Sequence, residues 1–78
     1  MSFNEKLNKY LTEFKISSKQ LSEISGISES VISRYRSGKR IPKTDSDNFN
    51  SIVDAFFNIS TKTDKSYTKE HIHKDLSL

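Results

Sequence analysis

The chain of 78 residues contains no cysteine, which excludes disulfide bonds and any cysteine-based zinc site. It also lacks a long apolar run. The longest, Ile52–Phe57, is interrupted by Asp54 and is far shorter than the ~20 residues of a membrane span. The first residues, Met1–Glu5, lack the basic and apolar segments of a signal peptide. We therefore expect a cytoplasmic protein with one small core, most easily built from short helices.

An excess of charge of one sign is also missing, because the net charge is only +3. This is a weak global signal for nucleic acid. The distribution of the charge is more informative, since one short segment without any acidic residue holds Arg34, Arg36, Lys39, Arg40 and Lys43. Such a run by itself indicates a solvated surface as readily as a nucleic-acid-binding one.

The spacing of apolar residues predicts a first helix near the N-terminus. Its apolar positions fall on one narrow stripe at helical periodicity and comprise Phe3, Leu7, Tyr10, Leu11 and Phe14. Ser2 and Glu5 stand at the spacing of a capping box, which favours a helix that begins just after Ser2.

A second and a third helix are predicted on either side of Gly26. The segment 19–24 is a short helical stretch capped by Ser17 or Ser18, with Leu21 and Ile24 directed inward. Gly26 ends it, and Ser28 caps a third helix at about Glu29–Ser37. On a helical wheel the third helix has an apolar side of Val31, Ile32 and Tyr35. Its opposite side is polar and consists of Glu29, Ser30, Ser33, Arg34 and Ser37.

The remainder of the chain predicts a fourth helix at about Asp47–Asn58, capped by Ser46, and then a polar linker at Ser60–Ser66. A short fifth helix within Tyr67–Leu78, capped by Thr68, would place Ile72 and Leu76 on one face. We thus expect a domain over residues 1–59. Residues 60–78 would supply the linker and the fifth helix, and would continue into a further C-terminal region that senses a ligand or oligomerises.

Two short helices joined by a tight glycine turn make a helix-turn-helix pattern, in which the first helix braces the second and the second fits the major groove of DNA. The segment Ser17–Pro42 resembles the lambda repressor and Cro family of phage and bacterial regulators. The matched positions are Leu21, Gly26, Ile27, Ser28, Val31, Ile32, Ser33, Tyr35, Gly38 and Pro42. The resemblance covers roughly Leu7–Phe57. It implies an all-α, compact four- or five-helix lambda repressor-like domain that binds double-stranded operator DNA, usually as a homodimer.

The resemblance also implies roles for individual residues. The base-contacting positions fall on Ser28, Glu29, Ser30 and Arg34, and Ser33 lies on the same polar side. The phosphate-contacting positions fall at the start of the second helix and after the third, on Ser18, Lys19, Ser37, Lys39, Arg40 and Lys43. The family often has glutamate where this chain has Arg36, so the usual ion pair with the first helix is in doubt and Arg36 is freed for a phosphate.

Two other classes of function compete with DNA binding. A protein-interaction module of the same fold, such as an antitoxin or a regulatory subunit, would use the same surface on a protein. An enzyme is disfavoured, because the sequence shows no clustered nucleophile and base, no glycine-rich phosphate loop and no metal-ligand spacing. His71 and His73 stand two positions apart and would not face each other on a helix. We therefore expect a regulator without catalytic residues, cofactor, metal or small-molecule site, and the basic segment favours DNA as its partner.

Overall fold

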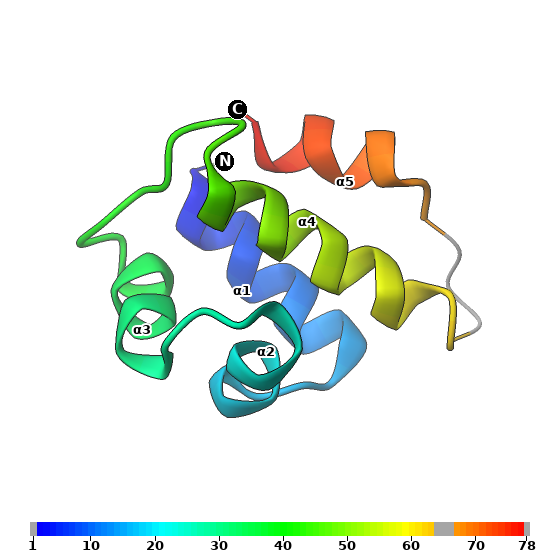
Figure 1. Ribbon diagram of the computed structural model, residues 1–78, viewed down its shortest axis with the longest axis horizontal. Helices are drawn as coiled ribbons and strands as arrows, with labels where there is room; N and C mark the ends of the chain where they lie inside the picture. The colour runs from blue at the N-terminus through cyan, green and yellow to red at the C-terminus, as the bar shows by residue number, and fades with distance from the viewer. Residues whose placement is uncertain (1, 64–66, 78) are drawn as a thin grey trace.

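The computed structural model describes residues 2–63 and 67–77, and within these ranges every regular element is an α-helix. The helices are α1 (Phe3–Phe14), α2 (Ser18–Ser25), α3 (Glu29–Ser37), α4 (Asp47–Ser60) and α5 (Lys69–Leu76). In Figure 1, α1 and α4 run through the middle of the molecule, with α5 along one side and α2 and α3 along the other. The prediction of a compact all-α fold is confirmed. Residues 64–66 of the predicted linker, and the chain ends at 1 and 78, lie outside the described residues.

Hydroxyl side chains and glycines set the helix boundaries, largely as predicted. Ser17, rather than Ser18, caps α2 by accepting the Gln20 N–H at 3.2 Å. Thr68 caps α5 in the same way, accepting the His71 N–H at 3.0 Å. Gly26 and Gly38 end α2 and α3 with φ of 78° and 81°, a left-handed backbone that glycine adopts at no steric cost.

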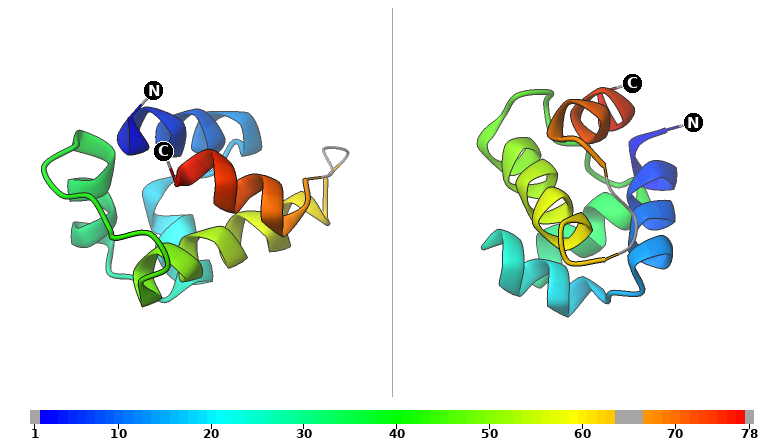
Figure 2. Two further views of the ribbon diagram at one scale, coloured as in Figure 1. Left: turned by 90° about the horizontal axis from the view of Figure 1, so that it is seen from above. Right: turned by 90° about the vertical axis from the view of Figure 1, so that its right-hand side faces the viewer.

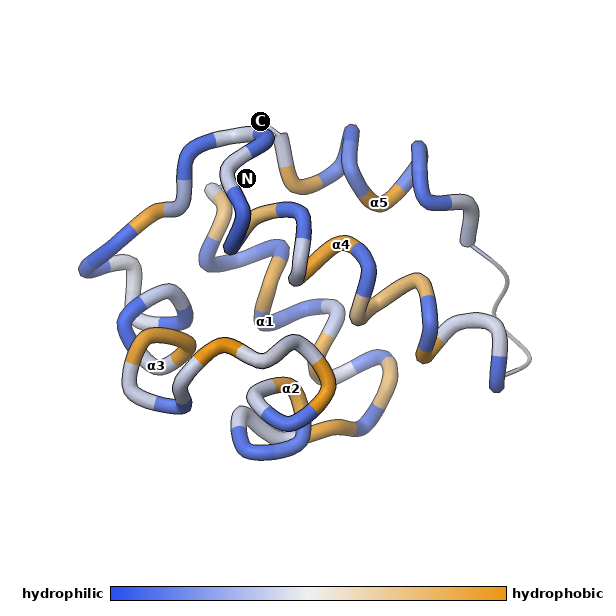
Figure 3. The backbone as a smooth tube through the Cα atoms, viewed as in Figure 1, coloured by the Kyte–Doolittle hydropathy of each residue, from blue (hydrophilic) through white to orange (hydrophobic). Residues whose placement is uncertain are grey.

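All five helices contribute to one hydrophobic core. Tyr10 stacks on Phe56 with ring centroids 5.1 Å apart, which joins α1 to α4 at its centre. In Figure 3 the hydrophobic stretches of α5 face α4, and Ile72 and Leu76 are fully buried there. The prediction for the fifth helix is therefore confirmed. The core comprises Phe3, Leu7, Tyr10, Leu11, Phe14, Leu21, Ile27, Ile32, Tyr35, Phe49, Ile52, Val53, Ala55, Phe56, Ile72 and Leu76.

Two residues predicted to face inward are less buried than expected. Ile24 is 46% exposed, because it lies near the end of α2 at the rim of the core, where it borders a surface groove with Ile59. Val31 is half-buried and packs against the edge of the core. The inner faces of these two short helices are accordingly narrower than the periodicity predicted.

Polar contacts reinforce the packing of α5 against α1. The carboxylate of Asp75 accepts hydrogen bonds from Lys6 Nζ and Tyr10 Oη, each at 2.8 Å. The hydrogen bond from Lys6 lowers the pKa of Asp75 below its ordinary value, and the bond from Tyr10 acts in the same direction. Burial raises the pKa of Tyr10, so its hydroxyl remains a donor.

No helix in the described ranges is long and apolar enough to cross a membrane.

Candidate nucleic-acid interface

The connection between α2 and α3 is short and internally hydrogen-bonded. Ile27, in the middle of the turn, is buried in the core with 7% exposure. Its carbonyl oxygen accepts a hydrogen bond from Ser22 Oγ at 2.5 Å, and its N–H donates to Ser25 Oγ at 3.2 Å. The turn is therefore fixed at its centre as well as at Gly26, which holds α2 and α3 at a defined angle (Figure 2).

One face of α3 is held against the rest of the domain. Ile32 is fully buried, and Tyr35 is buried with its ring edge on Phe3 at a centroid distance of 6.0 Å. The Tyr35 hydroxyl accepts a hydrogen bond from Asn48 Nδ2 at 2.9 Å, which ties α3 to the first turn of α4. The prediction that Tyr35 belongs to the core is confirmed.

The opposite face of α3 is open to solvent. All five predicted base-contacting residues are exposed there: Ser28, Glu29, Ser30, Ser33 and Arg34. The hydroxyl of Ser28 caps the helix by accepting the Val31 N–H at 3.4 Å, and it lies 3.3 Å from Ser30 Oγ. Apart from Glu29 and Arg34, this face presents only short serine side chains, which allow a close approach of the helix axis to another surface.

The segment Lys39–Asp45, here called the basic loop, runs from α3 to α4 with its ends fixed. At its start, Ser37 Oγ donates to the carbonyl oxygen of Arg34 at 3.1 Å, and the Arg40 N–H donates to the same oxygen at 3.3 Å. At its end, the Ser46 N–H donates to the carbonyl oxygen of Lys43 at 3.0 Å. The loop leaves its cationic side chains exposed beside α3: Lys39, Arg40 and Lys43.

None of these cations is held by an acidic side chain in the described part of the chain. The ion pairs found there join Lys6 to Asp75 and Lys69 to Asp54, and the imidazole of His73 contacts the carboxylate of Asp45. Arg34 and the three cations of the basic loop are therefore available to an anionic partner. Cations without a local acidic partner create a positive potential that attracts anions.

Arg36 joins α3 to both α1 and α2. Its Nε donates to Asn8 Oδ1 at 2.6 Å and its Nη1 donates to Ser18 Oγ at 2.8 Å. Asn8 Nδ2 in turn donates to the Arg36 carbonyl oxygen at 3.0 Å. The structure thus brings Arg36 and Ser18 together at the start of α2, where Lys19 is exposed.

Asn8 is a residue of this site that sequence reasoning missed. It stands outside the apolar stripe of α1, and a half-buried amide has no periodic signature. The one indirect signal is Arg36 itself, since an arginine in place of glutamate on α3 can donate to an amide oxygen on α1. Arg36 consequently donates two of its five N–H groups within the protein, and it has fewer donors left for a phosphate than the sequence suggested.

The two histidines make separate contacts. His71 stacks on Tyr67 with ring centroids 5.3 Å apart, whereas the Nε2 of His73 lies 2.6 Å from Asp45 Oδ1. A groove of about 630 Å³ between α4 and α5 is lined by residues of both charges, among them Asp54, Lys69 and Glu70. Across residues 2–63 and 67–77 no three metal-ligating side chains cluster.

Comparison with known proteins identifies the family to which these elements belong. A family model described as helix-turn-helix matches residues 7–46, from within α1 to the cap of α4. The match includes α2, the tight turn, α3 and the basic loop, which are the elements that form the exposed polar surface. No curated protein and no solved structure matches the chain significantly.

Proposed function

Since the chain belongs to the helix-turn-helix family of DNA-binding regulators, of the lambda repressor and Cro type, we propose that it binds a specific double-stranded operator and represses transcription from it. One observation carries this proposal. The exposed face of α3 carries short serine side chains together with Glu29 and Arg34, and directly beside it lies a basic loop whose cations have no acidic partner in the described structure.

In the proposed complex α3 lies in the major groove, which is wide enough for a helix. Ser28, Glu29 and Ser30 at its N-terminal end meet base edges, and Glu29 accepts a hydrogen bond from a cytosine amino group. Arg34 stands about one turn further along, with Ser33 beside it. Its guanidinium pairs with the N7 and O6 of a guanine. These contacts would supply the sequence preference.

The phosphate contacts come from both sides of α3. Ser37, Lys39, Arg40 and Lys43 grip one stretch of the DNA backbone without regard to sequence. On the other side, Ser18 and Lys19 at the start of α2 approach a second phosphate. Arg36 lies against Ser18 and retains N–H donors beyond the two that it gives to Asn8 and Ser18.

The expected number of protomers on DNA follows from the two-fold symmetry of the operators that helix-turn-helix domains bind. We propose a homodimer, with one protomer on each half-site of a near-palindromic sequence and half-sites about one helical turn apart. The proposed dimer binds DNA without a cofactor or a metal ion. It acts in the cytoplasm, where bacterial and phage operators are found.

Selection of bound fragments from a random DNA pool tests the proposal directly. We expect enrichment of one near-palindromic sequence and a steep loss of binding with salt. A chain that bound no duplex at low salt, or that bound every sequence equally, would contradict it. In that case the fold would have to serve a protein partner instead, as an antitoxin or a regulatory subunit does.

A further inference from the structure

The basic loop ends at Asp45, whose backbone is unusual. Its φ is 66°, in the left-handed region that non-glycine residues seldom adopt, although aspartate tolerates it better than most. Two contacts hold the backbone on either side. Asn50 Nδ2 donates to the Asp45 carbonyl oxygen at 3.3 Å, and Ser46 caps α4. This geometry fixes the direction in which the loop enters α4.

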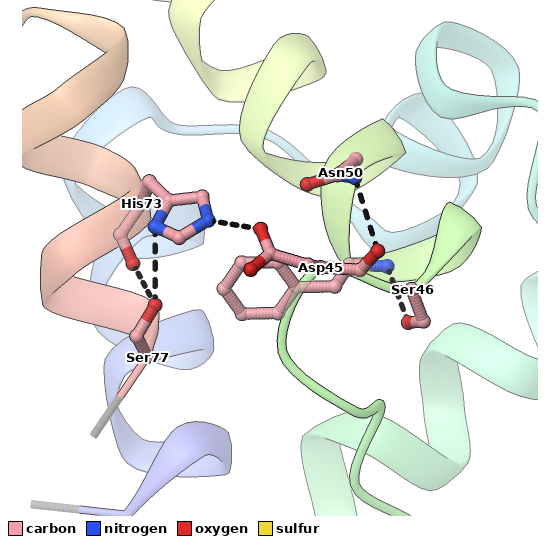
Figure 4. Close-up of polar contacts among 6 residues, drawn as sticks. Asp45, Ser46, Asn50, His73 and Ser77 are labelled. Carbon is pink, nitrogen blue, oxygen red and sulfur yellow. Dashed lines mark hydrogen bonds and ion pairs between the residues drawn. The ribbon is translucent and has the colours of Figure 1, made fainter.

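The side chain of Asp45 is bound by α5, as Figure 4 shows. His73 Nε2 lies 2.6 Å from Asp45 Oδ1. Because a carboxylate only accepts hydrogen bonds, Nε2 carries the proton of this contact. The imidazole is itself positioned: its Nδ1 lies 3.2 Å from Ser77 Oγ, and its ring meets Phe49 edge-on at a centroid distance of 5.1 Å.

These contacts form a continuous connection from α5 to the basic loop. Ile72 and Leu76 anchor α5 in the core on either side of His73 in sequence, so the imidazole projects from a fixed support. Asp45 is two residues from Lys43. The side chain of Asp45 is 69% exposed, and the contact with His73 is what restrains this side chain.

From this geometry we propose that His73 is a positioning residue for DNA binding. Through Asp45 it holds the basic loop in the conformation that presents Lys39, Arg40 and Lys43 to the DNA backbone. The inference rests on the proposed function, which assigns those cations to phosphates. It adds that α5, which lies beyond the matched helix-turn-helix segment, contributes to DNA affinity without touching DNA.

The contribution of the His73–Asp45 contact to DNA affinity should be small, because both side chains are partly exposed to solvent. A single polar contact between partly exposed side chains contributes little, and so we expect its loss to weaken DNA binding about two- to fivefold. The loss should be the same for an operator and for unrelated DNA, because the contacts of the basic loop do not depend on sequence.

Matched variants separate positioning from packing. His73→Phe keeps an aromatic ring against Phe49 but removes the donor, whereas His73→Gln keeps an N–H donor that reaches as far as Nε2. Asp45→Gly removes the carboxylate without straining the left-handed backbone. The double variant His73→Phe with Asp45→Gly completes a mutant cycle.

Two measurements on the full chain test the inference. Amide hydrogen exchange of residues 39–46 in the free protein reports the order of the loop, and fluorescence anisotropy with one fixed duplex reports affinity. We expect faster loop exchange and weaker binding in His73→Phe and Asp45→Gly, no further loss in the double variant, and near wild-type behaviour in His73→Gln. Thermal unfolding should stay within a few degrees of wild type, since a surface contact contributes little to global stability.

The outcomes distinguish this inference from the proposed function. Unchanged loop exchange in His73→Phe would overturn the inference, as would faster exchange with unchanged DNA affinity, or additive losses in the double variant. If wild-type protein bound no duplex, the proposed function would fail and the role in DNA binding with it. The exchange data would then still show whether His73 orders the loop.

Discussion

Arg36 Nε donates to Asn8 Oδ1 at 2.6 Å, and Asn8 Nδ2 returns a hydrogen bond to the Arg36 carbonyl oxygen at 3.0 Å. This reciprocal pair connects the last turn of α3 to α1. Through Ser18 the same guanidinium also reaches α2, so that one side chain spans three helices. The angle of α3 thus depends on a polar contact as well as on the core.

Breaking this contact should destabilise the domain and weaken DNA binding together. Hydrogen bonds to a charged group contribute more than neutral ones, so we expect Arg36→Ala to lower the free energy of unfolding by about 1–2 kcal/mol. Asn8→Ala should give a similar loss, and the double variant much less than the sum. Denaturant unfolding measures all three. Strict additivity would show that the two residues do not act as a pair.

The core position Leu21 should be far more sensitive than its neighbour Ile24. Leu21 is fully buried, so Leu21→Ala should cost about 2–5 kcal/mol, which is comparable to the whole stability of so small a domain. Ile24 is 46% exposed, and Ile24→Ala should cost under about 1 kcal/mol. Thermal unfolding compares them, and equal losses would mean that α2 is turned about its axis.

Asp75 should make stability depend on pH in the acidic range. Its pKa is lowered in the folded protein, chiefly by the hydrogen bond from Lys6, so the unfolded chain takes up a proton first as the pH falls. The stabilisation is therefore present above the ordinary aspartate pKa and is lost as the pH falls through the folded-state value.

Urea unfolding at a series of pH values measures this effect. Asp75→Asn should be less stable than wild type near neutral pH, and the difference should shrink as the pH falls below the ordinary aspartate pKa. Asp54→Asn is the matched control, because Asp54 pairs with Lys69 with both side chains more than half exposed and should change stability little. A difference for Asp75→Asn that stayed constant with pH would argue against a role for its charge.

The cations of the basic loop should act on all DNA alike. Replacing Lys39, Arg40 or Lys43 with alanine should weaken operator and unrelated DNA in equal proportion and reduce the salt slope of binding by about one unit each. Lys62→Ala, just beyond the far end of α4, serves as the control of equal charge change. A loss restricted to the operator, with the salt slope unchanged, would instead assign base contacts to the loop.

The sequence predicted the helices because their signals are local. Apolar periodicity, hydroxyl caps and the two glycines act within a few residues, and they located α2, the turn and α3 correctly. The polar face of α3 followed from the same periodicity, since a helix that buries Ile32 and Tyr35 must expose the opposite side.

The contacts that tie the elements together could not be predicted in this way. Asn8 with Arg36 and Asp45 with His73 each join residues 28 positions apart, and no periodic pattern links such partners. The left-handed backbone at Asp45, with φ of 66°, is likewise imposed by its surroundings rather than signalled by a glycine. Ile24 was predicted to face inward but is exposed, because helical periodicity gives the face of a residue and not its distance from the edge of the core.

If α3 reads bases, replacing Arg34 should reduce the discrimination between DNA sequences. A bidentate arginine–guanine pair discriminates against the wrong base by about 1–3 kcal/mol. The measurement is the affinity of wild type and Arg34→Ala for the selected operator and for an unrelated duplex at one salt concentration. We expect operator binding to fall by roughly one to two orders of magnitude while non-specific binding falls much less. An unchanged ratio of the two affinities would contradict it and would reduce Arg34 to a phosphate contact.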